Sequence, residues 1–224
     1  MLQKGIANAF WLKVLMAALM LLDHLYFFLP GMPEWFTWLG RLVAPTFTYL
    51  MTQGMLHTSD RVRYIKRMLY AGLVMFAGNC VLMLVFKTKL TNGIFLSLAV
   101  SAAILYYCER PRTGVDRAEA AVILPALLAA SFFCEGLLLC PVLALIFFYF
   151  HKNRLLMCAV YAASCPVILW ILPFDLFPQI LMVFAVIPIL LYNGKRGSNR
   201  AFAKYFFYVF YPAHVWALYI LRHL

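Results

Sequence analysis

The sequence is short of charged residues, and of acidic residues above all. Only 12% of its 224 residues are charged, with 8 acidic against 19 basic side chains. Soluble domains average about 25% charged residues, and no polar tract here is long enough to form one. The composition therefore excludes a soluble globular protein.

Signatures of metal-dependent and hydrolytic enzymes are also missing. The six cysteines are scattered along apolar stretches without a CxxC pair, as expected of small buried side chains rather than a disulfide or zinc framework. Neither an HExxH helix nor a GxSxG nucleophile elbow is present. We therefore expect no metal site.

Long hydrophobic runs fill most of the chain. It is 66% hydrophobic with a mean hydropathy of +0.88, and a membrane helix needs about 20 apolar residues. We expect one integral-membrane domain, 1–224, an all-α polytopic bundle of about nine transmembrane helices. Eight spans stay possible, since only Glu135 and Gly136 separate the fifth and sixth. The expected spans are 11–29, 35–56, 64–86, 92–108, 118–134, 136–150, 155–172, 176–192 and 205–221.

Basic residues are concentrated in alternate connections, such as residues 61–67 and 195–196, whereas the other connections hold only Lys87, Lys89 and Arg222. Cytoplasmic loops are the ones enriched in Lys and Arg. The pattern predicts a cytoplasmic N-terminus, and it explains the net charge of +11 without a nucleic-acid partner.

The first span carries polar residues that an anchoring helix does not need. Lys13 lies near its start, and Asp23 and His24 are adjacent well inside it. A charge near the bilayer centre costs at least about 2.5–3.5 kcal/mol on insertion scales. Asp23 and His24 therefore either have partners on other helices or face a cavity, and either makes them a site candidate.

Other polar residues fall at a similar depth on separate spans. Arg41 lies two turns into the second span, and Glu135 ends the fifth. Because neighbouring side chains on a helix point about 100° apart, we expect Asp23 to pair with Arg41, leaving Glu135 or another group for His24. His214, in the last span, is a further candidate, and packing or helix–helix hydrogen bonding is its simpler role.

The cytoplasmic side has a different chemistry. Glycines beside basic residues suit a phosphate-rich ligand, although topogenic charge or anionic lipid headgroups explain the same pattern. Lys13 alternatively snorkels to the interface, and His57 fits an interfacial role. The candidate phosphate ligands are Lys13, Arg61, Arg63, Lys66, Arg67, Asn193, Lys195 and Arg196.

Several motifs, in order along nearly the whole chain, resemble the TraX family. They are Lys13-x10-His24 with Asp23, Leu39-Gly-Arg41, Gly54-Met-Leu-His57-Thr58, Tyr64-Ile-Lys-Arg67, Glu135-Gly136, Tyr192-Asn-Gly-Lys-Arg-Gly197 and Phe210-Tyr211-Pro-Ala-His214. The family is named for an inner-membrane protein that N-acetylates pilin, and it is similar to the wider class of integral-membrane acyltransferases.

The resemblance implies a multi-pass protein of the bacterial cytoplasmic membrane that transfers acetyl groups from cytoplasmic acetyl-CoA. His24 would be the general base or an acyl relay, because its unperturbed pKa of about 6.5 suits proton transfer near neutral pH. Asp23, Arg41 and Glu135 complete the expected catalytic set, and His57, Tyr211 and His214 are further candidates. The acceptor stays open between a peptide or pilin amine, an envelope glycan and a lipid.

Two other classes of function remain open, a transporter and a non-enzymatic assembly factor. Buried Asp, His, Arg and Glu also build proton relays in transporters, although transporters usually show matching halves and none is visible here. A non-enzymatic membrane assembly factor would not need Lys13, Asp23, His24 and Arg41 together. The oligomeric state is open.

Overall fold

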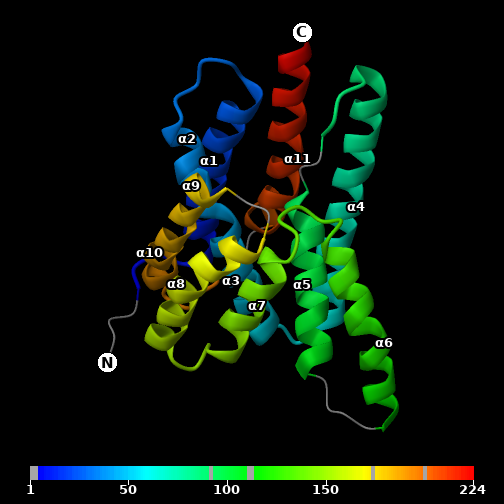
Figure 1. Ribbon diagram of the computed structural model, residues 1–224, viewed down its shortest axis with the longest axis vertical. Helices are drawn as coiled ribbons and strands as arrows, with labels where there is room; N and C mark the ends of the chain where they lie inside the picture. Colours follow the sequence, from blue (N-terminus) through cyan, green and yellow to red (C-terminus); the bar gives the residue numbers. More distant parts are fainter. Residues whose placement is uncertain (1–4, 91–92, 110–113, 173–174, 199–200) are drawn as a thin grey trace. The chain divides into compact units, whose positions relative to one another are not determined.

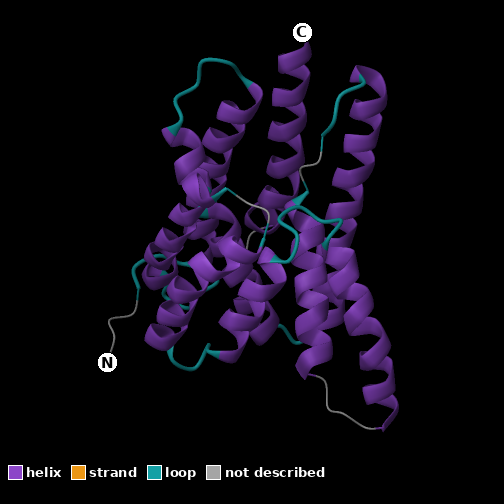
Figure 2. Ribbon diagram, in the orientation of Figure 1, coloured by secondary structure: helices purple, strands orange, loops and turns teal. Residues whose placement is uncertain are grey.

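The computed structural model describes residues 5–90, 93–109, 114–172, 175–198 and 201–224. Helices and loops make up these residues, and no strand is drawn among them (Figure 2). The chain forms two compact units, Met1–Leu50 with Asn153–Leu224 (unit 1) and Met51–Lys152 (unit 2).

Unit 1 contains the two ends of the chain. Its helices are α1 (Ala9–Phe28), α2 (Trp35–Gly40), the first half of α3 (Val43–His57), α8 (Arg154–Ile171), α9 (Leu176–Gln179), the 3-10 helix η1 (Ile180–Ala185), α10 (Val186–Leu191) and α11 (Ala201–His223). The helices of the expected second and eighth spans are interrupted. The second breaks at Arg41 and Leu42, and the eighth is divided into α9, η1 and α10.

Unit 2 contains the second half of α3, α4 (Arg61–Phe86), α5 (Ile94–Glu109), α6 (Gly114–Ser131) and α7 (Leu139–Tyr149). Here α5 packs against α4, α6 and α7 (Figure 1). Turns at residues 132–138 separate α6 from α7. The expected fifth and sixth spans therefore correspond to two helices, α6 and α7.

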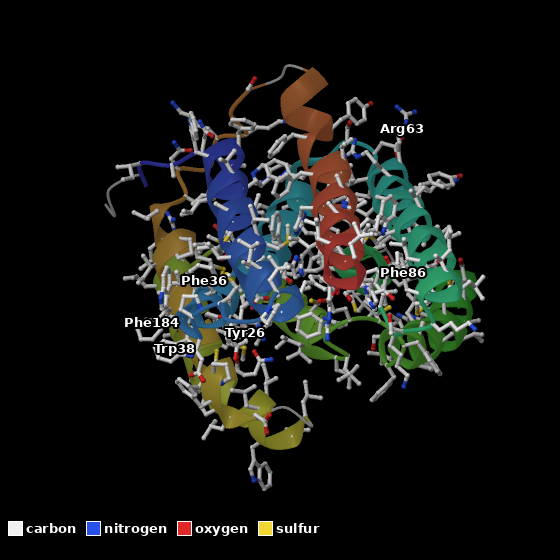
Figure 3. All side chains as sticks on the ribbon, turned by 90° about the horizontal axis from the view of Figure 1, so that it is seen from above. Tyr26, Phe36, Trp38, Arg63, Phe86 and Phe184 are labelled. Carbon is white, nitrogen blue, oxygen red and sulfur yellow. The ribbon has the colours of Figure 1, made fainter. Side chains whose placement is uncertain are left out.

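Three helices of the described residues, α1, α4 and α8, are long and apolar enough to cross a membrane. Shorter apolar helices are α5, α7 and the run Leu176–Leu191. Large apolar side chains are exposed on unit 1, among them the rings of Tyr26, Trp38 and Phe184 (Figure 3). Exposed apolar surface on long apolar helices is what lipid contact requires. The chain is a helical membrane protein.

The buried side of α1 positions the candidate site. Asn8 caps this helix, since its side chain accepts a hydrogen bond from the Trp11 N–H (3.1 Å). Residues at a spacing of four then form one buried stripe, as helical periodicity requires. The stripe consists of Leu12, Met16, Met20, His24 and Phe28.

Helices α1 and α11 lie side by side and run in the same direction (Figure 1). Near their starts, the rings of Phe10 and Phe207 are 6.5 Å apart between centroids, and near their ends those of Phe28 and Tyr219 are 6.1 Å apart. This parallel packing brings the first and last expected spans together.

Candidate active site

Two buried histidines meet between α1 and α11. Nδ1 of His24 lies 2.7 Å from Nε2 of His214, and only 6% and 8% of these two residues are exposed. The second ring nitrogen of His214, Nδ1, is 2.7 Å from the carbonyl oxygen of Phe210, one helical turn earlier. The sequence left Glu135 or another group as the partner of His24, and the structure places His214 there, 190 residues away in the sequence.

Aromatic rings surround this histidine pair. The Phe210 ring stacks on His214 with centroids 4.7 Å apart and planes 23° apart. The rings of Phe28 and Tyr211 lie 6.0 and 6.1 Å from that of His24. Tyr211, a candidate from the sequence, is therefore part of the wall of the site. Such a lining lowers the local dielectric and strengthens hydrogen bonds inside it.

The ion pair expected between Asp23 and Arg41 is present. Nη2 of Arg41 donates to Oδ1 of Asp23 at 2.7 Å, and 22% of each side chain is exposed. The same guanidinium donates to the carbonyl and hydroxyl oxygens of Thr37 (3.0 and 2.8 Å) and to Oε1 of Gln179 (3.1 Å). Arg41 therefore connects α1 to α2 and α9, and the Asp23 carboxylate is directed toward Arg41.

Lys13 lies on the same face of α1 as His24. Eleven residues separate them, about three helical turns and so about 16 Å along the axis. The Lys13 ammonium lies 5.7 Å from the centre of the Phe207 ring on α11, a cation–π distance. Lys13 and His24 therefore both contact α11, Lys13 near the start of α1 and His24 near its end.

The loop after α10 is fixed to the start of the chain. Backbone bonds join Ala7 to Leu191 (2.9 Å) and to Asn193 (2.8 Å), and the Ala9 N–H donates to the Lys195 carbonyl (2.9 Å). Within the loop, Asn193 Oδ1 accepts from the Lys195 N–H (2.9 Å). The side chains of Lys195 and Arg196 are exposed. The basic loop therefore lies at the end of α1 that carries Lys13.

Arg154, at the start of α8, also holds this loop. Its Nη2 donates to the carbonyl oxygens of Ile189, in the last turn of α10, and of Tyr192, the residue that follows α10. Its Nε is buried without a hydrogen-bond partner among the described residues. Arg154 was not among the candidate residues from the sequence, and it follows the residue that caps α8, Asn153.

The remaining candidates belong to unit 2. Arg61 forms a two-pronged ion pair with Glu109 (2.5 and 3.0 Å), and Arg63 pairs with Asp60 (3.2 Å). Arg67 lies over the Tyr64 ring, 5.3 Å from its centre, and Lys66 is exposed. A phosphate bound by Arg61 or Arg63 would compete with these carboxylates.

His57 and Glu135 also have partners within unit 2. Exposed His57 donates from Nδ1 to the carbonyl of Gln53 (2.8 Å). Oε2 of Glu135 accepts from the Gly93 N–H (2.6 Å) and its carbonyl from the Ser97 hydroxyl (2.5 Å). Glu135 thus caps the start of α5, a structural role that its sequence position did not indicate.

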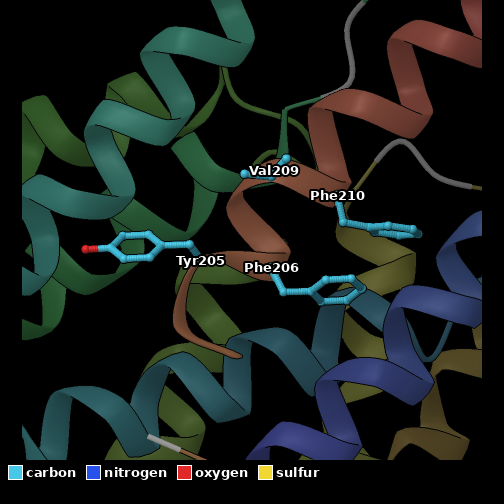
Figure 4. A pocket seen from close by; sticks show the side chains of 4 residues that line it. All are labelled: Tyr205, Phe206, Val209 and Phe210. Atoms are coloured by element: carbon cyan, nitrogen blue, oxygen red, sulfur yellow. The ribbon is translucent and has the colours of Figure 1, made fainter. Parts of the chain in front are cut away.

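An apolar groove lies on α11 near the histidine pair. Tyr205, Phe206, Val209 and Phe210 line its volume of about 360 Å³ (Figure 4). The Phe206 ring stacks on that of Phe210, with centroids 5.4 Å apart. One row of stacked rings therefore extends from this groove to His214. No cluster of three or more His, Cys, Asp or Glu side chains suited to a metal occurs in the described ranges.

Comparison with known proteins gives one family. The model of the TraX protein family matches residues 9–222. The probable fimbrial assembly protein FimC, serogroup H1, of Dichelobacter nodosus is 24% identical over 229 residues, covering 93% of each chain. No solved structure matches.

Proposed function

The chain belongs to the TraX family, and from this premise we propose that it is a membrane-embedded acetyltransferase. It takes the acetyl group from cytoplasmic acetyl-CoA and transfers it to an acceptor of fimbrial or envelope assembly, such as the N-terminal amine of a pilin. The observation that carries the proposal is the buried His24–His214 pair, aligned on one helix face with Lys13 and the basic loop.

The basic loop suits the phosphates of the donor. Lys195 and Arg196 are exposed, and none of the ion pairs found among the described residues involves them. Gly194 and Gly197 have positive φ angles (79° and 87°), which turn the backbone on either side of the two cations. Cations beside such turns bind phosphate groups. The Asn193 side chain accepts a hydrogen bond from the Lys195 N–H, and this bond helps to fix the conformation of the loop.

The distance along α1 fits an extended donor. Phosphates held at the loop end, with Lys13 beside them, leave about 16 Å of helix between Lys13 and His24. The pantetheine arm of acetyl-CoA separates its phosphates from its thioester, and it would cover this distance. The apolar rings along α11 suit that arm. Arg61, Arg63 and Arg67, which are also candidate ligands of the donor phosphates from the sequence, belong to unit 2.

The reaction follows from the chemistry of a neutral imidazole. The acceptor amine or hydroxyl attacks the acetyl carbon while His24 takes its proton, and the carbon–sulfur bond then breaks. His24 returns the proton to the departing thiolate, so its own state is unchanged at the end. General-base catalysis of this kind contributes about 10²–10⁴-fold. The Asp23–Arg41 pair holds the neighbouring turn of α1 in place.

The proposal includes nine crossings of the bacterial cytoplasmic membrane. The parallel packing of α1 and α11 supports it, because the first and last spans run the same way only when their number is odd. With the N-terminus inside, the basic loop and Lys13 face the cytoplasm, where acetyl-CoA is present.

The test is acetyl-CoA binding and cleavage by the purified protein in detergent. We expect saturable binding that weakens at least tenfold in a Lys195→Ala/Arg196→Ala variant, and slow thioester cleavage that His24→Ala abolishes. A Lys87→Ala/Lys89→Ala variant removes two exposed charges from unit 2, neither of them a candidate ligand, and is the matched control. An equal loss there would mean general charge attraction, and no binding by the wild type would refute the proposal.

A second candidate is a non-enzymatic assembly role, which the name of the Dichelobacter nodosus relative, a probable fimbrial assembly protein, favours. Complementation separates the two. A strain lacking the protein should regain acetylated fimbrial subunits from the wild-type gene but not from His24→Ala. Full function from His24→Ala would favour the assembly role.

A further inference from the structure

The hydrogen bonds around His214 determine which of its nitrogens carries the proton. The Phe210 carbonyl oxygen, 2.7 Å from Nδ1, is only an acceptor, so Nδ1 must carry hydrogen. A second proton on Nε2 would place a cation among the aromatic rings, where burial of an unpaired charge is costly. His214 is therefore neutral, with its lone pair on Nε2.

That lone pair determines the state of His24 in turn. The 2.7 Å contact between His24 Nδ1 and His214 Nε2 needs one hydrogen, and His214 does not supply it. His24 Nδ1 is thus the donor. In a neutral imidazole one nitrogen donates and the other accepts, so the basic nitrogen of His24 is Nε2.

We propose that His214 is a positioning residue that holds His24 in its Nδ1–H tautomer and makes Nε2 the atom that accepts the proton of the acetyl acceptor. The catalytic part of this inference rests on the proposed acetyl transfer. The assignment of the His24 tautomer rests only on the hydrogen bonds. His214 touches no reacting atom and acts through His24.

The hydrogen bond from His24 to His214 also stabilises the protonated form of His24 that the reaction produces. When Nε2 of His24 accepts the proton, the imidazolium keeps its Nδ1–H on His214, and a hydrogen bond from a charged donor is about twice as strong as a neutral one. In serine hydrolase triads a buried carboxylate has this task. Here Asp23 is directed to Arg41, and the neutral His214 avoids placing another charge in the apolar site.

The position of His214 is itself well determined. Its Nδ1 is fixed on the Phe210 carbonyl, and its ring is stacked on Phe210 and packed edge-on to Tyr211 (4.7 and 5.7 Å). An aromatic ring without an acceptor nitrogen can therefore occupy the same space. Two substitutions at position 214, one that keeps a hydrogen-bond acceptor and one that keeps only the ring, can therefore be compared.

The experiment compares His214→Gln with His214→Phe in protein labelled with ¹⁵N in its histidines. A Gln side-chain oxygen can accept from His24 Nδ1, whereas Phe keeps the packing without an acceptor. The ¹⁵N chemical shifts report which His24 nitrogen carries hydrogen, and thioester cleavage at saturating acetyl-CoA reports kcat. His151→Gln, an exposed histidine bonded to its own Phe148 carbonyl, is the control for labelling and activity.

We expect wild type and His214→Gln to show the Nδ1–H tautomer, with kcat of the Gln variant within about tenfold of wild type. His214→Phe should show mixed tautomers and lose kcat by on the order of 10²-fold, with KM nearly unchanged. A wild-type His24 protonated on Nε2 would overturn the proposal without any variant having to fold. Unchanged kcat in His214→Phe would overturn its catalytic part. Wild-type protein with the Nδ1–H tautomer but no thioester cleavage would refute the proposed function and leave the tautomer assignment standing.

Discussion

Gly40 lies directly against the side chain of Asp23. A Cβ atom added at Gly40 would overlap the carboxyl carbon and Cβ of Asp23. The absence of a side chain at this position therefore lets α2 approach α1 closely enough for Arg41 to reach Asp23. The ion pair depends on this close approach.

We predict that Gly40→Ala displaces Asp23 and separates α2 from α1. Overpacking of this kind costs about 1–3 kcal/mol, which should lower the apparent Tm in detergent. Gly93→Ala is the control, since a Cβ there meets open space and φ is not positive. It should change stability by less than about 1 kcal/mol. Equal effects of the two substitutions would show that the contact with Asp23 is unimportant.

The Asp23–Arg41 pair should show strong coupling in a double-mutant cycle. With 22% of each side chain exposed, the pair lies between surface bridges of about 0–1 kcal/mol and buried ones of about 3–5 kcal/mol. We expect Asp23→Asn and Arg41→Gln each to cost about 1–3 kcal/mol. The double variant should cost clearly less than their sum, because neither charge is then left alone. Additive losses would contradict a direct pairing.

Much of the helical organisation could be predicted from the sequence, and its interruptions could not. Each of the nine expected spans overlaps helix, because long apolar runs without charges favour helices that satisfy their own backbone. Mean hydropathy does not reveal the break at Arg41 or the division of residues 176–191, since one polar residue, Arg41 or Gln179, changes the average of an apolar span very little.

The contacts of the candidate site were also only partly predictable from the sequence. The Asp23–Arg41 pair was predictable because isolated opposite charges in apolar spans need each other. The contact of His24 with His214 was not, because it depends on how α1 and α11 pack, and neither helix carries a signal of its partner. Glu135 was one of the groups left open for His24, and its carboxylate accepts a hydrogen bond from the Gly93 N–H within unit 2.

Arg154 should be a main support of the basic loop. Arg154→Lys keeps the charge but loses the planar fork that reaches two carbonyls, and should cost about 1–2 kcal/mol. Arg154→Met leaves the Ile189 and Tyr192 carbonyls without this donor and should cost about 2–4 kcal/mol. Hydrogen exchange at residues 5–9 and 191–197 should rise in the same order.

The control for Arg154 is Arg63→Met, which removes a cation whose side chain is 85% exposed. It should leave exchange at residues 191–197 unchanged. Protection of the loop that is unaffected by Arg154→Met would show that the backbone bonds of Ala7 and Ala9 hold it alone.

Gly197 and Gly194 offer a matched pair for the loop itself. Both have positive φ angles (87° and 79°), so alanine is strained at either by about 1 kcal/mol. At Gly197 a Cβ would also meet the side chain of Asn8, at 2.6 Å from Oδ1, whereas at Gly194 it meets open space. Gly197→Ala should therefore disturb the cap that starts α1 as well as the loop. We expect it to weaken acetyl-CoA binding and to lower the apparent Tm further than Gly194→Ala does. Equal effects would mean that only backbone strain matters and that the Asn8 contact does not connect the loop to α1.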